Sequence, residues 1–432
     1  MTAFVFDVFV PSGTPTHTYI QRVGERNEQK LSDGLDIPNM VISVSGPSKT
    51  GKTALIDTCI TPERIIPLSG QSLRSASELW QSVMRWIGGP DEVEKIKSRT
   101  LGAEISGTTT AEAGVILAKA KIEGSLRGSV GTETATSEKF GVVFFEAVVR
   151  ELKDGDFVVF LDDFHYISIE AQIDIAKSIK AISERGVRVC IASVPHKSDD
   201  MVRANDELTG RTVSIVFGYW SVEELMLIAD AGFRALGVDV SPSTKQRLAI
   251  EALGSPQLMQ TLCLNLCLEM GIREKQELVS RTTVSDNTFA TALERTTLTT
   301  DYLRTVEKLH TGAKERGTQR KEFNFSDGSK GDVYRAVLLA IVANPPRLSF
   351  DYDEIMARIK LICIDDAPSG SSAQLALTQM GGIAKDVGAV APVLEWDDDK
   401  LEVINPYFMF YLRSSNKLGD IYTKKKGMVS PT

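Results

Sequence analysis

One short stretch constrains this chain more than any other: an apolar run at residues 40–44 leads directly into the sequence GPSKTGKT at residues 46–53. This stretch fits the pattern G-x-x-x-x-G-K-[ST]. Glycines let the backbone wrap around an anion, so that its N–H groups and the start of the next helix point at phosphate oxygens. A chance match would lie in an ordinary glycine-bearing turn. Here a strand is predicted before the loop and a helix after it, so we interpret it as a phosphate-binding loop.

The polar side chains of the loop have predicted roles. Lys52 supplies a positive charge to the β- and γ-phosphates of a nucleotide, and Thr53 supplies a hydroxyl to Mg²⁺. The predicted nucleotide-binding residues of the loop and of the helix start are Gly46, Pro47, Ser48, Lys49, Thr50, Gly51, Lys52, Thr53 and Ala54. The predicted cofactors are ATP or ADP with Mg²⁺.

Two acidic residues follow the apolar strand predicted at 157–161. We expect Asp162 to hold Mg²⁺ through water and Asp163 to orient or deprotonate the attacking water. The alternative is that these two carboxylates only cap a helix. The phosphate-binding loop in the same chain argues against this alternative. Ser193, at the end of the strand predicted at 187–193, is a candidate polar contact to the γ-phosphate, whereas His165 and His196 are weaker candidates.

Length and composition indicate the number of domains and exclude several classes of function. The chain has 432 residues and a formal net charge of -8, which predicts two or three domains and argues against indiscriminate binding to nucleic acid or acidic membranes. No apolar stretch approaches the roughly 20 residues that a membrane span needs. The five cysteines contain no C-x-x-C pair, so neither a disulfide framework nor a zinc site is expected. We expect a cytoplasmic protein.

Strands alternating with helices predict an α/β fold: a parallel sheet with helices on both faces, followed by a helical lid and a winged-helix domain. Within the first segment we expect a strand at 4–10 and a helix at about 19–34. Glycines and threonines break the pattern between 89 and 136, where a hairpin is expected. The predicted organisation is an N-terminal segment 1–39, a core 40–220 with an insertion at 89–136, a lid 221–307, a linker 308–332, a winged helix 333–415 and a tail 416–432.

The sequence DDFHY at 162–166 resembles the second acidic motif of STAND ATPases (signal-transduction ATPases with numerous domains), and residues 18–35 resemble the N-terminal segment of STAND and archaeal replication-initiator ATPases of the AAA+ group. The resemblance covers roughly residues 15–300. It implies that Tyr19, Ile20 and Arg22 lie at the adenine base and that Pro256 lies near the nucleotide.

The chain also departs from these families. Where many AAA+ proteins carry a lid arginine that contacts the γ-phosphate, this chain has Gln257, and no histidine follows His310 to read bound ADP in the winged helix. Arg203 and Arg211 are the arginines best placed to reach the phosphate of a neighbouring subunit, but either could equally be a solvated surface charge. The predicted catalytic set is therefore Asp163, Lys52, Ser193 and Arg211.

These features favour a slow ATPase that acts as a switch, forms a homo-oligomer or binds a partner, and controls a separate effector, with antiviral defence or stress signalling as the setting by family analogy. The alternatives are a DNA-associated AAA+ regulator of transposition or replication, and a scaffold that binds ATP without turnover. DNA binding is not favoured, because the third winged-helix segment has Lys385 as its only base and the following turn is triply acidic. Two basic clusters could still contact nucleic acid: Lys314, Arg316, Arg320 and Lys321 in the linker, and Lys119, Lys121 and Arg127 in the insertion.

Overall fold

The computed structural model describes residues 3–22, 24–106, 132–194, 210–277, 280–314, 320–387 and 392–427. It contains two compact units. The sheet unit comprises Gln21–Gly46 and Lys52–Phe217, and the helical unit comprises Met1–Ile20, Pro47–Gly51 and Gly218–Thr432. The predicted phosphate-binding loop therefore supplies residues to both units.

A five-stranded parallel sheet forms the centre of the sheet unit, in the order β2-β3-β4-β1-β5. The strands are β1 (Val41–Ser45), β2 (Ile65–Ser69), β3 (Val158–Asp162), β4 (Arg188–Ser193) and β5 (Thr212–Val216). Side chains alternate between the two faces of each strand: in β3, Val158 and Phe160 belong to one buried cluster and Val159 and Leu161 to the other. Both faces are thus apolar and need cover.

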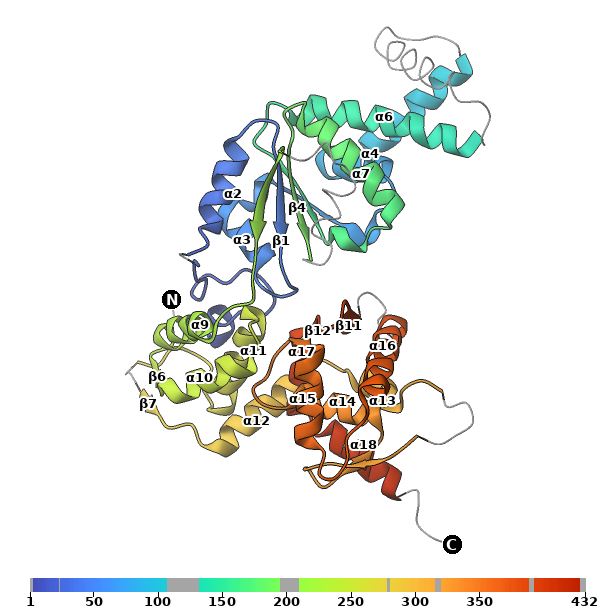
Figure 1. Ribbon diagram of the computed structural model, residues 1–432. Coiled ribbons are helices and arrows are strands. Elements are labelled where there is room, and N and C mark those ends of the chain that lie inside the picture. Colours follow the sequence, from blue (N-terminus) through green and yellow to red (C-terminus); the bar gives the residue numbers. More distant parts are fainter. Residues whose placement is uncertain are drawn as a thin grey trace. The chain divides into compact units, whose positions relative to one another are not determined.

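Helices supply this cover on both faces (Figure 1). One face packs against α2 (Asn27–Asp36) and α3 (Lys52–Cys59), through residues such as Leu31 and Ile56. The other packs against α4 (Ala76–Ser106), α6 (Thr132–Leu152) and α7 (Ile169–Ser183), through residues such as Trp80, Phe144 and Ile175. The predicted α/β architecture is confirmed.

Two expectations for the first 40 residues are wrong. The segment predicted as a strand at 4–10 contains the short helix α1 (Val5–Val8). Val5, Val8 and Phe9 are buried while Phe4 and Phe6 are exposed, so the apolar residues follow the i, i+3, i+4 spacing of a helix and not strict alternation. The helix predicted from about Tyr19 begins only at Asn27.

The predicted insertion at 89–136 differs from expectation in its described parts. Helix α4 continues through a kink at Gly89, where φ is +73°, as far as Ser106, and α6 starts at Thr132. The hairpin expected between these helices and the basic residues Lys119, Lys121 and Arg127 lie outside the described residues.

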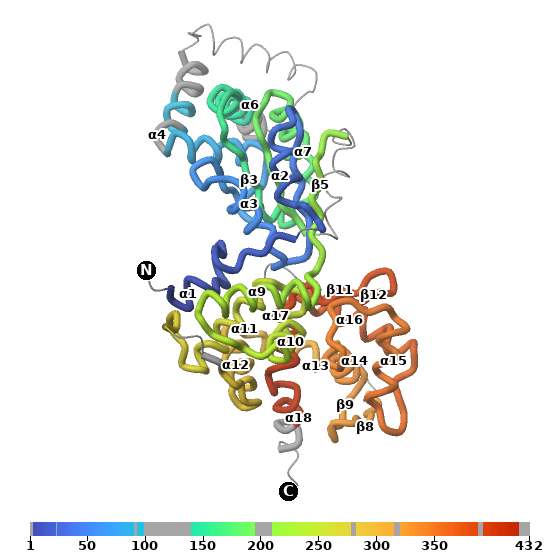
Figure 2. Tube along the Cα trace, turned by 90° about the vertical axis from the view of Figure 1, so that its left-hand side faces the viewer, coloured from blue at the N-terminus to red at the C-terminus, as the bar shows by residue number. Residues whose placement is uncertain are grey.

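The helical unit begins with serine-capped helices: α9 (Val222–Ala235), α10 (Pro242–Glu251), α11 (Pro256–Glu269) and α12 (Asp286–Thr297). Each preceding serine accepts a hydrogen bond from a backbone N–H of the first turn, which satisfies one of the unpaired donors at a helix start. A serine followed three residues later by glutamate predicts a capping box at Ser221 and Glu224, and the structure confirms it. Helices α9, α10 and α11 pack on one another (Figure 2), and the two short strands β6 (Val238–Val240) and β7 (Ser280–Thr282) pair beside them.

The C-terminal part contains three helices and a small antiparallel sheet. The sequence predicts helices at 333–343, 352–362 and 372–386 and strands at 391–396 and 400–405. The helices α14 (Val333–Val342), α15 (Tyr352–Ile362) and α16 (Gly370–Val387) match the predicted ones. The predicted strand pair is present as β11 (Leu394–Asp397) and β12 (Lys400–Val403), and the three-residue strand β10 (Ser349–Asp351), which sequence reasoning missed, completes the sheet.

The remaining elements of this part are α13 (Leu303–Thr311), β8 (Phe323–Asn324), β9 (Lys330–Gly331), α17 (Pro406–Ser414) and α18 (Lys417–Gly427). The predicted linker at 308–332 holds the paired strands β8 and β9. One buried apolar cluster runs from α1 through α9 to α17, so the helical unit has a continuous core. Within the described residues, no helix is both long and apolar enough to cross a membrane.

Candidate nucleotide-binding site

The loop after β1 is shaped by a close approach at its first glycine. A Cβ added to Gly46 would lie 2.4 Å from Cβ and 2.9 Å from the carbonyl oxygen of Phe217, so no side chain fits there. Lys49 and Gly51 both have positive φ, at +67° and +101°. Left-handed residues in such a loop are typical of an anion-binding nest, in which successive backbone N–H groups point into one concavity.

Lys52 and Thr53 open helix α3, whose N-terminus favours negative charge. The Lys52 ammonium donates to the carbonyl oxygen of Gly46 at 2.9 Å, which holds it across the mouth of the loop. The Thr53 hydroxyl donates to Oδ2 of Asp162 at 3.1 Å. The structure therefore brings together the two residues predicted to hold the metal, although 109 positions separate them in the chain.

Asp162 ends strand β3, which is separated from β1 by β4. Burial raises the pKa of its carboxyl group and the neighbouring charge of Asp163 raises it further, while hydrogen bonds from the Asp163 N–H and from Thr53 and the charge of Lys52 act in the opposite direction. The pKa of Asp162 is raised overall, so the hydrogen bonds and the charge of Lys52 do not fully offset the cost of burying the charged carboxylate. A hydroxyl oxygen and an undercompensated carboxylate oxygen are the hard ligands that Mg²⁺ prefers, and the donor set fits the predicted metal.

Asp163 occupies the left-handed region at φ +59°, which is uncommon for a residue other than glycine. Its Oδ2 accepts a hydrogen bond from Nε2 of Gln71 at 3.2 Å. Its carbonyl oxygen would lie only 2.3 Å from a Cβ at Gly70, in the 3-10 turn η2 (Gly70–Ser72) that follows β2. Sequence reasoning missed Gln71; its position just after a strand of the same sheet was the available signal.

Ser193 lies beside the start of the loop. It is buried, it is the register partner of Ser45, and its carbonyl oxygen accepts from the Gly46 N–H at 3.2 Å. His165 lies in the turn η3 (Phe164–Tyr166) with its ring 4.1 Å from that of Tyr166. His196 and Arg203 lie outside the described residues.

Arg211 is not brought together with Lys52. Its carbonyl oxygen accepts from the Val41 N–H at the amino end of β1, whereas the loop begins at the carboxyl end. Its guanidinium pairs with Glu184 after helix α7. A contact from Arg211 to a neighbouring subunit stays a prediction.

The tip of the loop, Pro47–Gly51, belongs to the helical unit. There the hydroxyl of Ser255 donates to the Lys49 carbonyl oxygen at 3.1 Å, and the indole N–H of Trp220 donates to the Thr50 carbonyl oxygen at 3.0 Å. Pro256, the first residue of α11, has its Cγ 4.0 Å from the position of a Cβ on Gly51. Sequence reasoning predicted Pro256 near the nucleotide but missed Ser255 and Trp220.

The residues predicted at the adenine base fall in different units. Tyr19 and Ile20 are half-buried in the helical unit, where Ile20 packs against the core. Arg22 belongs to the sheet unit and forms an ion pair with Glu25 at 2.6 Å. Base binding by these residues stays a prediction. Gln257, which replaces the lid arginine, donates its side-chain amide to the Pro11 carbonyl oxygen at 2.7 Å.

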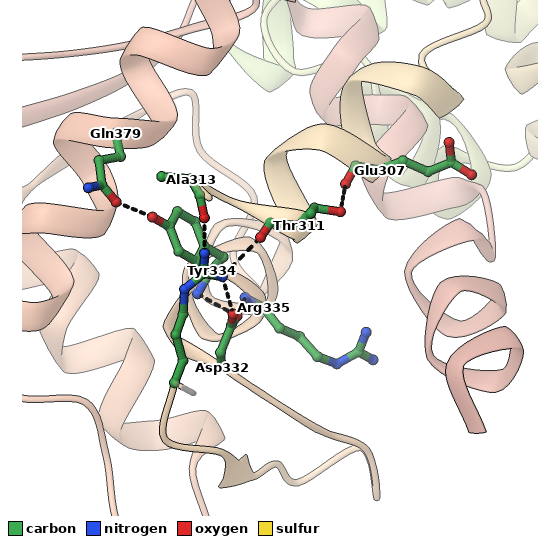
Figure 3. A network of polar contacts seen from close by, with 8 residues as sticks. Glu307, Thr311, Ala313, Asp332, Tyr334, Arg335 and Gln379 are labelled. Atoms are coloured by element: carbon green, nitrogen blue, oxygen red, sulfur yellow. Dashed lines mark hydrogen bonds and ion pairs between the residues drawn. The ribbon is translucent and has the colours of Figure 1, made fainter. Parts of the chain in front are cut away.

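Three of the basic residues considered for nucleic-acid contact in the predicted linker and winged helix pair with carboxylates of the chain: Arg320, Lys321 and Lys385. Arg320 pairs with Asp332 at 2.6 Å and stacks over Tyr334. The hydroxyl of Tyr334 donates to Gln379 of α16 (Figure 3). Lys321 pairs with Asp366, and Lys385 pairs with Glu395 at 3.2 Å. Arg316 lies outside the described residues, while Lys314 lines a hollow of about 620 Å³ with Arg320 and Lys321.

No protein-family model and no curated protein matches the chain. Among solved structures, it is similar to the Walker-type ATPase PABY2304 of Pyrococcus abyssi, at 14% identity and a TM-score of 0.50 over 95% of this chain and 99% of that one. It is also similar to the ORC2 protein of Aeropyrum pernix (11% identity, TM-score 0.48, 98% and 100% covered) and to Cdc6p of Pyrobaculum aerophilum (10%, 0.42, 97% and 100%). The parallel sheet, the loop after β1 and the likeness to a Walker-type ATPase show that the chain has the fold of a P-loop ATPase.

Proposed function

We propose that the protein binds ATP and ADP with Mg²⁺ and acts as a slowly hydrolysing molecular switch. The observation that carries this proposal is the contact between the Thr53 hydroxyl and the Asp162 carboxylate, beside Lys52 at the start of α3. It joins the loop that would bind phosphate to the carboxylate that would bind the metal.

Each residue has a role that derives from its chemistry. The N–H groups of the loop and the Lys52 ammonium would bind the phosphate oxygens. Thr53 and Asp162 would hold Mg²⁺, which supplies positive charge to the phosphates when bound. Asp163 would orient the attacking water, since its carboxylate accepts a hydrogen bond from Gln71 in the turn after the neighbouring strand β2. Ser193 would contact the phosphate from β4.

Slow turnover is expected because the lid position carries no arginine and Arg211 lies away from Lys52. The lid position of the γ-phosphate arginine is occupied by Gln257, whose amide is bound to Pro11. Arg211 lies beside the amino end of β1, whereas the loop that carries Lys52 follows its carboxyl end. A transition-state arginine is typically worth about 10³–10⁵ in rate, so a site that receives such a charge from neither the lid position nor Arg211 of the same chain is better suited to a switch than to a motor.

The STAND-like motif at 162–166 supports a switch that forms a homo-oligomer or binds a partner and controls a separate effector, in antiviral defence or stress signalling. We propose that helices α14 to α16 with the sheet β10-β12-β11 form the winged helix of this switch. A protein contact suits this part better than DNA, because Arg320, Lys321 and Lys385 each pair with a carboxylate.

The switch is tested by light scattering on a sizing column, with Mg²⁺ and either ADP or a non-hydrolysable ATP analogue, together with phosphate release. We expect a larger assembly or a changed elution with the ATP analogue and turnover well below one per second. Identical behaviour in both nucleotides, or rapid turnover, would contradict a switch.

The alternative is a DNA-associated regulator, and the order of elements in the proposed winged helix is the observation that favours it. A gel shift with duplex DNA at physiological salt separates the two functions. Phosphate contacts dominate DNA affinity, and three acidic residues lie together here: Asp397 at the end of β11, and Asp398 and Asp399 in the turn before β12. We therefore expect weak binding that is lost as salt increases; tight binding would favour the alternative.

A further inference from the structure

Two side chains of the helical unit bind consecutive carbonyl oxygens at the tip of the loop. Ser255 donates to the carbonyl oxygen of Lys49 at 3.1 Å, and Trp220 donates through its indole N–H to the carbonyl oxygen of Thr50 at 3.0 Å. Neither residue belongs to the motif at 46–53, and both contact the loop through its backbone.

These hydrogen bonds fix the direction of two backbone N–H groups. A peptide unit is planar and trans, so its carbonyl oxygen and its N–H point in opposite directions. Holding the Lys49 carbonyl therefore directs the N–H of Thr50 to the other side of the backbone, and holding the Thr50 carbonyl does the same for the N–H of Gly51. Successive N–H groups with a common direction are what an anion-binding nest requires.

The two donors are themselves held in place. Ser255 is fully buried and caps α11, since its Oγ also accepts from the Leu258 N–H at 3.2 Å. The backbone N–H of Trp220 donates to the Gly254 carbonyl oxygen at 3.0 Å. Gly254 has φ +73°, and a Cβ there would lie 2.8 Å from Cβ of Tyr219. The start of the lid helix and the segment before α9 thus form one rigid support.

Burial makes water a poor substitute for these donors. Thr50 and Ser255 both have 0% of their surface exposed, and the Thr50 hydroxyl is already used by the Pro47 carbonyl oxygen at 2.8 Å. The Thr50 carbonyl, if it lost its donor, would be left buried without a partner, and rotation of its peptide plane would relieve this.

We infer that Ser255 and Trp220 are positioning residues for the phosphates of a nucleotide: they preset the N–H groups of Thr50 and Gly51 and thereby raise phosphate affinity. The inference rests on the proposed nucleotide binding at this loop. Coupling between two binding events is reciprocal. If the hydrogen bonds from Ser255 and Trp220 strengthen phosphate binding, bound phosphate strengthens these hydrogen bonds by the same free energy, so the lid responds to the nucleotide.

The test is Trp220→Phe, which keeps the aromatic ring and removes the donor. Trp80→Phe is the matched control, because the Trp80 indole donates to Ser178 at 2.6 Å and makes no contact with the loop. One net hydrogen bond corresponds to about a fivefold change in affinity. Calorimetry should show that Trp220→Phe weakens Mg·ATP by about fivefold and leaves adenosine unchanged, while Trp80→Phe changes neither affinity.

A second variant and a second readout keep the outcome decisive. Ser255→Gly retains an acceptable helix start and removes the other donor, and Ser255→Thr should restore it. In nucleotide-free protein, amide hydrogen exchange over Thr50 and Gly51 should become faster in Trp220→Phe and Ser255→Gly than in the wild type. Unchanged exchange and unchanged ATP affinity in the folded variants would overturn the positioning role. If amide exchange is faster in the variants but the wild type binds no ATP, the positioning role of Ser255 and Trp220 is supported and the proposed function is refuted.

Discussion

At the scale of residues, two adjacent carboxylates have different surroundings. Asp162 ends its strand within reach of Thr53 and is partly buried. Asp163 is in the left-handed region and accepts a hydrogen bond from Gln71, in the turn after the neighbouring strand β2. The left-handed turn lets two consecutive side chains from one strand reach different partners. Different partners allow different roles, one toward the metal and one toward the water.

Two substitutions separate these roles. Asp163→Asn should leave Mg·ATP bound and lower the rate of phosphate release by about 10²–10⁴-fold, the usual contribution of a general base. Asp162→Asn should instead reduce ATP affinity when Mg²⁺ is present and have little effect in EDTA. Calorimetry with and without Mg²⁺ and a phosphate-release assay give both results. Wild-type turnover by Asp163→Asn would show that the assignment is wrong.

Gly46→Ala tests the close approach at the start of the loop. The new Cβ would meet Phe217 at 2.4 Å, and overpacking of this kind costs about 1–3 kcal/mol. We expect a lower free energy of unfolding in urea and weaker ATP binding. Gly382→Ala in α16 is the control, because nothing lies within 4 Å of its Cβ; it should be neutral or stabilising. Equal stability of the two variants would argue against the clash.

At the scale of elements, local patterns predicted most of what the structure contains. The buried strands, the serine-capped helices and the three C-terminal helices follow from apolar period, caps and glycine stops. The errors have local causes: the almost uniformly apolar run at residues 4–10 does not distinguish a helix from a strand, and β10 has only three residues. The donors Trp220 and Ser255 could not be found from the chain, because their partners lie 170 and 206 positions away and only the fold brings them together.

The docking of α18 gives a prediction at this scale. Arg335 of α14 is 1% exposed, donates to the Leu418 carbonyl oxygen at 2.8 Å and to Ser329 at 2.9 Å, and stacks on Tyr422. Arg335→Met should lower the free energy of unfolding by about 1–3 kcal/mol, since it leaves buried acceptors without donors. Amide exchange in α18 should rise while ATP affinity stays unchanged.

The exposed Arg304 on α13 supplies the control for that substitution, and Arg304→Ala should alter neither property. Unchanged exchange in α18 of Arg335→Met would mean that this helix is held by other contacts.

At the scale of the whole molecule, the charge distribution and the loop argue for the same kind of protein. The formal net charge is -8, and the cations considered for nucleic-acid contact at Arg320, Lys321 and Lys385 are paired within the chain. The phosphate-binding loop is contiguous in sequence yet contributes residues to both compact units.

The central claim is that this loop binds a nucleotide through Lys52, and a calorimetric titration of Mg·ATP tests it most directly. The wild type is compared with Lys52→Ala and with Lys177→Ala, an exposed lysine of α7 that lies outside the site. We predict saturable binding of one ATP per chain to the wild type and to Lys177→Ala, and none detectable to a folded Lys52→Ala. Equal affinity of Lys52→Ala and the wild type, or no binding to the wild type, would contradict the claim.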